Sequence, residues 1–215
     1  MFEVRFSSPL QDFTFRNKIQ KILTGAQGAV IPNEAINYKD VPQKLSVVVQ
    51  PLRIGITSES ENKEKNLRAI STLANSLNDE LRFGYVGRLG FRQIHYLEVE
   101  SDSYDTLTEL FKSKFFSSAS GLINAANDIA LPLTINQYPY PVNFNLGPMQ
   151  GSELSEKGVL EFDDLKLPEL YLMADLDAFT SGPTMSHKFV KTFLSDSCSI
   201  FDKIHSSISK EWSSK

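Results

Sequence analysis

The C-terminal part of the sequence predicts one long amphipathic helix, and this helix limits what the chain can fold into. It runs from about Ser186 to Trp212, and its apolar residues recur with a period of about 3.6. At 1.5 Å per residue such a helix is about 40 Å long. An apolar stripe of that length must be covered, so we expect it to pack across a sheet or against a second copy of the chain. The stripe consists of Phe189, Val190, Phe193, Leu194, Ser197, Ile200, Phe201, Ile204, Ile208 and Trp212.

A hydrophobic strand is predicted just before this helix, at Leu170–Phe179. Asp175 and Asp177 are two residues apart in it, and such residues point to the same face of a strand. Carboxylate oxygens bind hard cations, so the pair could hold Mg²⁺ or Mn²⁺. The alternative, which we favour for so common a motif, is a polar face that meets water or pairs with arginine or lysine. Three further carboxylates precede the strand closely enough to join a metal site: Glu161, Asp163 and Asp164.

The remaining elements predict an α+β protein. Helices are indicated after the capping-box pattern of Ser58 and Glu61 and after Asp102. Strands that are adjacent in sequence favour antiparallel or mixed pairing over a doubly wound parallel sheet. We expect one α+β domain over residues 1–215, with a mixed or mostly antiparallel sheet packed by two to three helices and the long C-terminal helix; a subdivision near 117–130 is the alternative. The further strands are indicated at residues 2–6, 45–57, 82–100, 129–148 and 159–167.

Composition argues against several classes of protein. The chain has 215 residues, and its 26 acidic side chains outnumber the 22 basic ones, which gives a net charge of −4. That balance argues against broad electrostatic binding to nucleic acid or to an anionic membrane. The single cysteine, Cys198, excludes an intrachain disulfide framework and favours a reducing cytoplasm. We find no signal peptide at Met1–Phe6 and no run of about 20 apolar residues, so we expect a cytoplasmic protein without membrane contact.

Arginines and glycines are interspersed in the middle of the chain, at Arg82–Arg92. Arg88 and Arg92 could contact phosphate, since a guanidinium group binds it through two parallel hydrogen bonds. His95 follows on the same predicted strand and joins these two arginines as a candidate ligand-binding set. The segment is neither a P-loop nor a dinucleotide-binding fingerprint. The alternative, which we favour, is a twisted hairpin whose arginines pair with the carboxylates of the last strand.

Aromatic side chains lie between these arginines, at Phe83, Tyr85 and Phe91. Stacked aromatic rings can bind single-stranded nucleic acid. The acidic balance of the chain and the lack of an RNP-type motif favour core packing for these rings instead. No motif assembles a nucleophile: the sequence has no HExxH and no serine in a GxSxG elbow, and its three histidines are far apart. Cys198, on the amphipathic helix, is expected to be a packed residue.

Two segments resemble a sporadically distributed family of conserved hypothetical bacterial proteins. One is Arg88-Leu89-Gly90-Phe91-Arg92, which is similar to an R-x-G-x-R strand in the middle of these proteins. The other is the strand Leu172–Phe179 with the helix that follows it, similar to an LDxDxF strand before a helix with H…I…F…I periodicity. The chain departs from the pattern at Gln93-Ile94-His95, in place of an aromatic–asparagine pair, and at Met173-Ala174. The resemblance implies an arginine strand and an aspartate strand as recurring parts. The family has no established activity, so no catalytic residue follows from it.

Our leading interpretation is a non-enzymatic interaction or accessory protein, either chaperone-like or an oligomeric scaffold. It rests on the long C-terminal helix and on the lack of a nucleophile, metal-cluster or cofactor motif, and it predicts a homo-oligomer with a protein partner and no cofactor. The first alternative is a metal-dependent phosphoryl or nucleotide-processing enzyme, in which Asp175 and Asp177 hold Mg²⁺ or Mn²⁺. In that enzyme Arg88 or Arg92 would neutralise phosphate charge. The second alternative is a nucleic-acid-binding accessory factor that uses the arginine–aromatic segment.

Overall fold

The structure, a computed structural model, divides the chain into two compact units. Unit 1 consists of Met1–Phe91 and Phe179–Ser197, and unit 2 consists of Arg92–Ala178 and Cys198–Lys215. Three elements contribute residues to both units: β6 (Val86–Glu98), β9 (Leu170–Ser181) and α6 (His187–Ser213). The structure describes residues 1–8, 21–22, 27–31, 35–59, 62–83, 86–116, 121–151, 153–156, 162 and 167–213.

Unit 1 contains an antiparallel sheet whose strands follow the order β2-β3-β4-β5-β1-β6. The first strand of the chain, β1, therefore lies between β5 and β6. Its residues alternate between the two faces of the sheet, with Phe2 and Val4 in the core and Glu3 and Arg5 on the other face. The strands are β1 (Phe2–Phe6), β2 (Gln27–Ile31), β3 (Ala35–Asp40), β4 (Leu45–Gln50), β5 (Arg53–Ser58) and the first part of β6.

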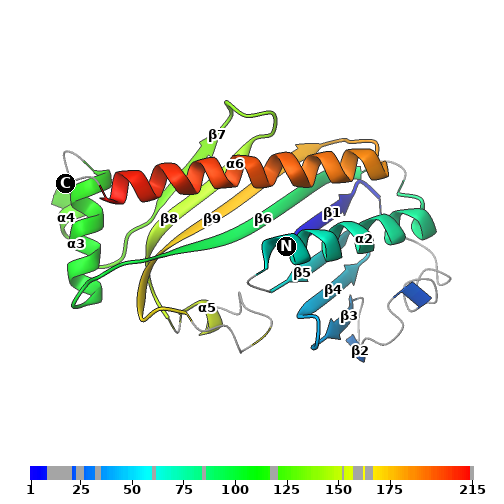
Figure 1. The fold of residues 1–215 in the computed structure, drawn as a ribbon, viewed down its shortest axis with the longest axis horizontal. Helices are drawn as coiled ribbons and strands as arrows, with labels where there is room; N and C mark the ends of the chain where they lie inside the picture. The colour runs from blue at the N-terminus through cyan, green and yellow to red at the C-terminus, as the bar shows by residue number, and fades with distance from the viewer. Residues whose placement is uncertain are drawn as a thin grey trace. The chain divides into compact units, whose positions relative to one another are not determined.

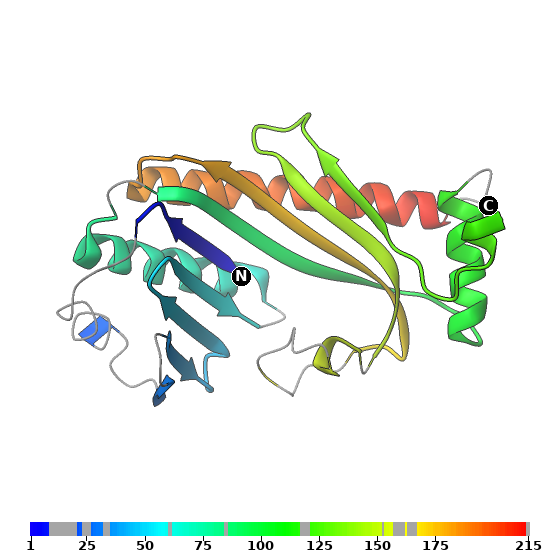
Figure 2. The ribbon, with the colours of Figure 1, turned by 180° about the vertical axis from the view of Figure 1, so that it is seen from behind.

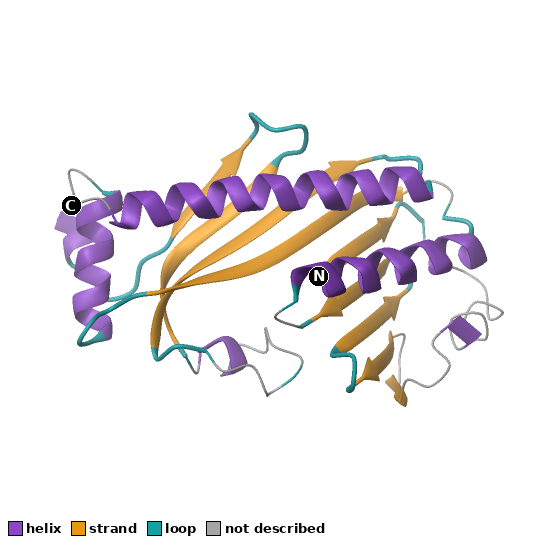
Figure 3. Cartoon of the chain, viewed as in Figure 1, coloured by secondary structure: helices purple, strands orange, loops and turns teal. Residues whose placement is uncertain are grey.

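Helix α2 (Lys63–Leu81) belongs to unit 1 and is one of the helices drawn in purple in Figure 3. It begins later than the sequence predicts. The predicted cap, Ser58, is the last residue of β5, and its hydroxyl donates to Asn66 Oδ1 at 2.8 Å. Asn62 caps the helix instead, because its side chain accepts from the backbone N–H of Lys65. Asparagine and serine are equally good caps, so the pattern alone could not choose between them. Glu61 lies outside the described residues. The helix buries Ile70, Leu73, Ala74 and Leu77.

Unit 2 contains strands in the order β6-β9-β8-β7, and β7–β8 and β8–β9 are antiparallel pairs. The segment 129–148, predicted as one kinked strand, forms a hairpin instead. The chain leaves β7 at Ile135 and returns in β8 from Val142, passing Pro139 and Pro141 between them. Prolines lack the N–H that a paired strand needs, which explains the break. The two strands are β7 (Leu131–Ile135) and β8 (Val142–Gln150).

The helices of unit 2 include one predicted helix and two short ones. Helix α3 is capped by Ser103, whose side chain accepts from the backbone N–H of Thr106, one residue after the predicted cap Asp102. The strand predicted at 159–167 lies largely outside the described residues. The helices are α3 (Tyr104–Phe115), α4 (Gly121–Asn124) and α5 (Glu153–Glu156).

The apolar stripe of α6 is covered by the chain itself. In unit 1 Val190 and Phe193 are fully buried, and in unit 2 Phe201 is fully buried and Ile204 nearly so. Of the two arrangements expected for this stripe, the structure has the first, in which the helix packs within its own chain. Within unit 1, Figure 1 shows α2 in front of the strands, and Figure 2, from the opposite side, shows these strands in front of α2.

These elements confirm the predicted fold class, an α+β protein with an antiparallel sheet and a long C-terminal helix. In unit 1 the opposite face of β1 carries Glu3 and Arg5. In unit 2 the face of β9 that carries Asp175 also carries Tyr171, which belongs to a second buried apolar cluster with Met149 and Leu154. In the described ranges, no helix combines the length and the apolar content that crossing a bilayer requires.

Candidate anion-binding site

Three arginines occupy matching positions on three adjacent strands of unit 1. Arg53 on β5 lies opposite Arg5 on β1, and Arg5 lies opposite Arg88 on β6. Side chains at matching positions stand on the same face of a sheet, and adjacent strands are only about 4.8 Å apart. We call Arg53, Arg5 and Arg88 the arginine row.

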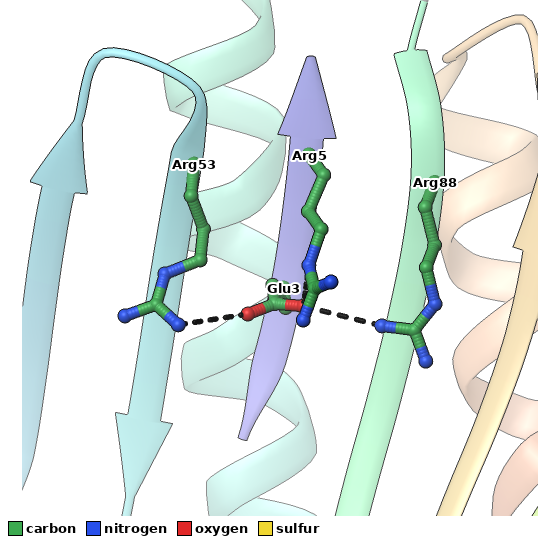
Figure 4. Close-up of polar contacts among 4 residues, drawn as sticks. All are labelled: Glu3, Arg5, Arg53 and Arg88. Carbon is green, nitrogen blue, oxygen red and sulfur yellow. Dashed lines mark hydrogen bonds and ion pairs between the residues drawn. The ribbon is translucent and has the colours of Figure 1, made fainter. Parts of the chain in front are cut away.

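One carboxylate, that of Glu3, holds all three guanidinium groups. Glu3 is two residues before Arg5 on β1 and therefore on the same face. Its Oε1 accepts from Arg5 Nε at 2.7 Å and from Arg88 Nη1 at 3.2 Å, and its Oε2 accepts from Arg53 Nη1 at 3.2 Å. Figure 4 shows the three side chains converging on Glu3 from three strands. Without this carboxylate, three like charges would lie side by side.

Glu3 is deeply placed, whereas two of its partners reach solvent. The Glu3 side chain is 7% exposed, against 54% for Arg5, 40% for Arg53 and 22% for Arg88. The Arg88 guanidinium also lies over the ring of Phe179, 4.8 Å from its centroid, a cation–π contact that fixes its place. Arg5 and Arg53 are therefore the members of the row that a partner can reach.

Two glycines flank Glu3 on the sheet. In the strand register Glu3 lies between Gly55 of β5 and Gly90 of β6, so neither neighbour carries a side chain. Among the described residues, a Cβ atom added at Gly55 would meet nothing within 4 Å. The neighbouring strands therefore leave room beside Glu3 for the arginine side chains that converge on it.

The arginine row has more donors than Glu3 can use. Three guanidinium groups contact the single carboxylate of Glu3, and only one N–H group of Arg5 and one of Arg53 donate to it. Arg53 Nε is buried and has no hydrogen-bond partner. The terminal NH₂ groups of Arg5 likewise donate to nothing in the part of the chain that the structure describes. The site can thus accept a further anion through charge-assisted hydrogen bonds.

The three residues predicted to bind one ligand do not form one site. They are Arg88, Arg92 and His95. Arg88 belongs to the arginine row in unit 1. Arg92, in unit 2, forms a bidentate pair with Asp175: Nε donates to Oδ1 at 2.6 Å and Nη2 to Oδ2 at 2.7 Å. This is the pairing with the last strand that we favoured from the sequence. The hairpin predicted with it is wrong, because Val86–Glu98 forms one continuous strand, β6. His95 is three residues from Arg92 on β6, so it lies on the opposite face of the strand.

His95 is part of a chain of polar contacts in unit 2. Its Nε2 is 3.1 Å from Gln93 Oε1, and its ring centroid is 5.1 Å from that of His205. Gln93 Nε2 in turn donates to the sulfur of the buried Cys198 at 3.3 Å. These contacts connect β6 with α6, and they explain His95 and Cys198 as packed polar residues.

The predicted metal pair, Asp175 and Asp177, lies on β9 opposite Asn145 and Asn143 of β8. Both oxygens of Asp175 accept hydrogen bonds from Arg92, and the positive charge of this guanidinium group opposes a cation beside it. Among the described residues, no group of three or more histidine, cysteine or acidic side chains is placed to hold a metal ion. The further carboxylates that could have joined them, Glu161, Asp163 and Asp164, lie outside the described residues.

The aromatic side chains between the arginines do not form a stacking platform. Phe83 and Phe91 are both buried in the core of unit 1, as the sequence favoured. Tyr85 lies outside the described residues. Buried rings cannot stack on a base, so the nucleic-acid alternative loses the two aromatic groups that the structure places.

Glu3, Arg5 and Arg53 were not among the predicted site residues. The alternation of Phe2–Phe6 did place Glu3 and Arg5 on one polar face, and that pattern was the available signal. Nothing local connects this strand with Arg53, because their pairing depends on long-range strand register.

Comparisons of the chain with models of protein families, with curated proteins and with solved structures find no match. The function of the arginine row must therefore be inferred from its own chemistry.

Proposed function

We propose that the protein is a non-enzymatic interaction protein, and that its arginine row binds an acidic segment of a partner protein. The supporting observation is that Arg5 and Arg53 share the carboxylate of Glu3 and each keep N–H groups with no partner among the described residues. Both side chains also reach solvent.

The position of the row on paired strands supports binding. Arg5 and Arg53 are held on a rigid scaffold, with Glu3 orienting one N–H of each. A partner carboxylate would bind the remaining N–H groups, and Glu3 would stay in place. Guanidinium groups suit this role because they bind carboxylates in a planar, two-bond geometry and hold water weakly.

Binding of a short fluorescein-labelled peptide of alternating glutamate and serine, measured by fluorescence anisotropy at low salt, tests the proposal. We expect the double variant Arg5→Gln/Arg53→Gln to weaken binding by about tenfold or more, because charge-assisted hydrogen bonds contribute about 1.5–3 kcal/mol each. Arg82→Gln is the matched control, since Arg82 is exposed at the end of α2 and outside the row.

Three outcomes would contradict the proposal: no binding at low salt, equal binding by the double variant, or equal binding of a peptide with lysine in place of glutamate. Added salt should weaken the binding, since exposed charges are screened. Stronger binding of a single-stranded oligonucleotide than of the peptide would favour the nucleic-acid alternative instead.

A homo-oligomer and a cytoplasmic location remain separate proposals. The α6 stripe is covered within the chain, so it no longer supports an oligomer. The large apolar side chains that are exposed among the described residues come from five separate segments: Val41, Leu52, Tyr96, Leu110 and Leu133. Light scattering across a concentration series tests the oligomer, and a monomer throughout would rule it out.

The cytoplasmic location rests on the single cysteine, which is buried.

The metal-dependent enzyme has weaker support, because Arg92 occupies both oxygens of Asp175. It would be supported if Mn²⁺ raised the melting temperature and Asp175→Asn abolished that rise.

A further inference from the structure

A cleft opens on the other face of unit 1, between α2 and the strands β3 and β4. It has a volume of about 460 Å³. Val47, which lines it, lies opposite Ile56 in the register, whereas Gly55, beside Glu3, lies opposite Val48. Successive strand residues alternate between faces, so this cleft and the arginine row are on opposite faces of the sheet. We call it the α2 cleft.

Apolar side chains form one part of the α2 cleft. Tyr38 of β3, Val47 of β4 and Leu73 of α2 are all buried and line it. Burial raises the pKa of Tyr38, because its ionised form would lose hydration. The Tyr38 hydroxyl has no hydrogen-bond partner among the described residues, although it is not itself fully buried. The cleft thus offers an apolar wall with one hydroxyl.

Cationic side chains form another part of the lining. Lys65 and Arg68 are three residues apart on α2, so they lie on the same side of the helix, and both are exposed. Neither side chain forms an ion pair or hydrogen bond within the described ranges. The one carboxylate of the lining, Asp40, accepts from the backbone N–H of Gln43 and so belongs to the β3–β4 turn. The lining therefore has two cations without a partner among the described residues, Lys65 and Arg68, and one carboxylate, Asp40, which already accepts a hydrogen bond.

We propose that the α2 cleft binds a small organic acid, with its apolar body on Tyr38, Val47 and Leu73 and its anionic head on Lys65 and Arg68. The cleft volume lies within the range of about 300–1,000 Å³ that is usual for small-molecule sites. An apolar wall without charge would suit any hydrocarbon, and cations without the wall would suit any small anion. Their combination selects an amphipathic acid. This site is independent of the arginine row.

The fluorescent sulfonate 1-anilinonaphthalene-8-sulfonate is the probe, used with the full chain, because it combines an apolar body with one anionic head. We expect its fluorescence to rise on binding. Arg68→Gln should weaken the affinity by about tenfold, since one charge-assisted contact is lost. Thr72→Trp should abolish binding, because Thr72 lines the cleft from an exposed position and the indole would fill it. Arg82→Gln, at the end of the same helix, should bind like the wild type.

Competition separates the two parts of the recognition. Decanoate should displace the probe, whereas decanol, which lacks the charge, should displace it at least tenfold less well, and inorganic phosphate should not displace it. Equal displacement by decanol would overturn the assignment of Lys65 and Arg68, and displacement by phosphate would overturn that of the apolar wall. Equal probe affinity in all three variants, with unchanged circular dichroism, would overturn the site itself.

Discussion

The two units each hold an arginine–carboxylate arrangement, and these differ in the number of arginines per carboxylate. In unit 2 one arginine, Arg92, binds one carboxylate, Asp175, through two hydrogen bonds that use both carboxylate oxygens. In unit 1 three arginines share Glu3. A matched pair uses its own donors and acceptors. An unmatched cluster keeps donors that an outside anion can use, which is why we place the function in unit 1.

Glu3→Gln should have the largest effect on stability. The change removes the carboxylate charge that all three guanidinium groups contact, and the Glu3 side chain is almost fully buried. We expect the free energy of unfolding to fall by about 2–3 kcal/mol, less than for a fully buried pair because the arginines reach solvent. Urea denaturation measures it. Glu98→Gln, an exposed change at the end of β6, is the control and should have almost no effect. An equally small loss for Glu3→Gln would mean that the arginines do not depend on this carboxylate.

Breaking the Arg92–Asp175 pair of unit 2 should lower the free energy of unfolding by less than Glu3→Gln does. Arg92→Gln and Asp175→Asn should each lower the free energy of unfolding by about 1 kcal/mol, because the pair is partly solvated. The double variant should lose little more than either single variant, since the two residues act as one unit. Urea denaturation of all three variants completes the cycle. Fully additive losses would show that Arg92 and Asp175 do not stabilise each other.

Tyr171 carries a buried polar group of unit 2 that is not hydrogen-bonded, in contrast to the Arg92–Asp175 pair. Its hydroxyl is buried without a hydrogen-bond partner, and burial, with the negative charge of Glu153, raises its pKa to about 12. The pKa is about 10 in an unfolded chain, so the wild-type protein loses stability as the pH rises from about 10 towards 12, because the unfolded chain ionises first. Tyr171→Phe should remove this loss.

At neutral pH, Tyr171→Phe should raise the free energy of unfolding by up to about 1 kcal/mol, because it deletes an unsatisfied buried hydroxyl. Thermal unfolding of both proteins from pH 8 to pH 11 measures the difference. Tyr138→Phe, at a half-buried position of unit 2, is the control. A steeper alkaline loss in Tyr171→Phe than in the wild type would contradict the prediction.

Arg5→Gln should have the smallest effect, within about 0.5 kcal/mol of the wild type in urea. Arg5 is the most exposed member of the row, and its removal leaves Glu3 with two arginines and less repulsion between like charges. Acidic-peptide binding should nevertheless fall. A stability loss as large as that of Arg92→Gln would mean that Arg5 serves the fold, and the comparison between the units would fail.

Much of the fold follows from local patterns in the sequence. The stripe of α6, the alternation of β9 and the succession of strands predict an antiparallel α+β protein, because burial of apolar faces decides these features. The exact start of α2 does not follow, since Ser58 and Asn62 are both good caps and only the tertiary structure extends β5 to Ser58.

The candidate site was predictable only in part. Arg88 and Arg92 could be found as arginines on a strand, but the sequence does not tell which carboxylate each one meets. Glu3 and Arg53 are fifty residues apart, and their contact depends on the pairing of β1 with β5. A shift of one residue in that register would place Arg53 on the opposite face.

The interleaving of the two units along the chain has a consequence for biosynthesis. Unit 1 begins at Met1 but is completed only by Phe179–Ser197, which brings the buried Val190 and Phe193. A ribosome must therefore translate as far as Ser197 before the first strands obtain their last core residues. The pairing of β1 with β5 and β6 and the cover by α2 can form earlier, whereas the cover by α6 arrives late. Contacts this distant in sequence also slow folding. We expect the nascent chain to depend on protection from aggregation until translation passes Ser197.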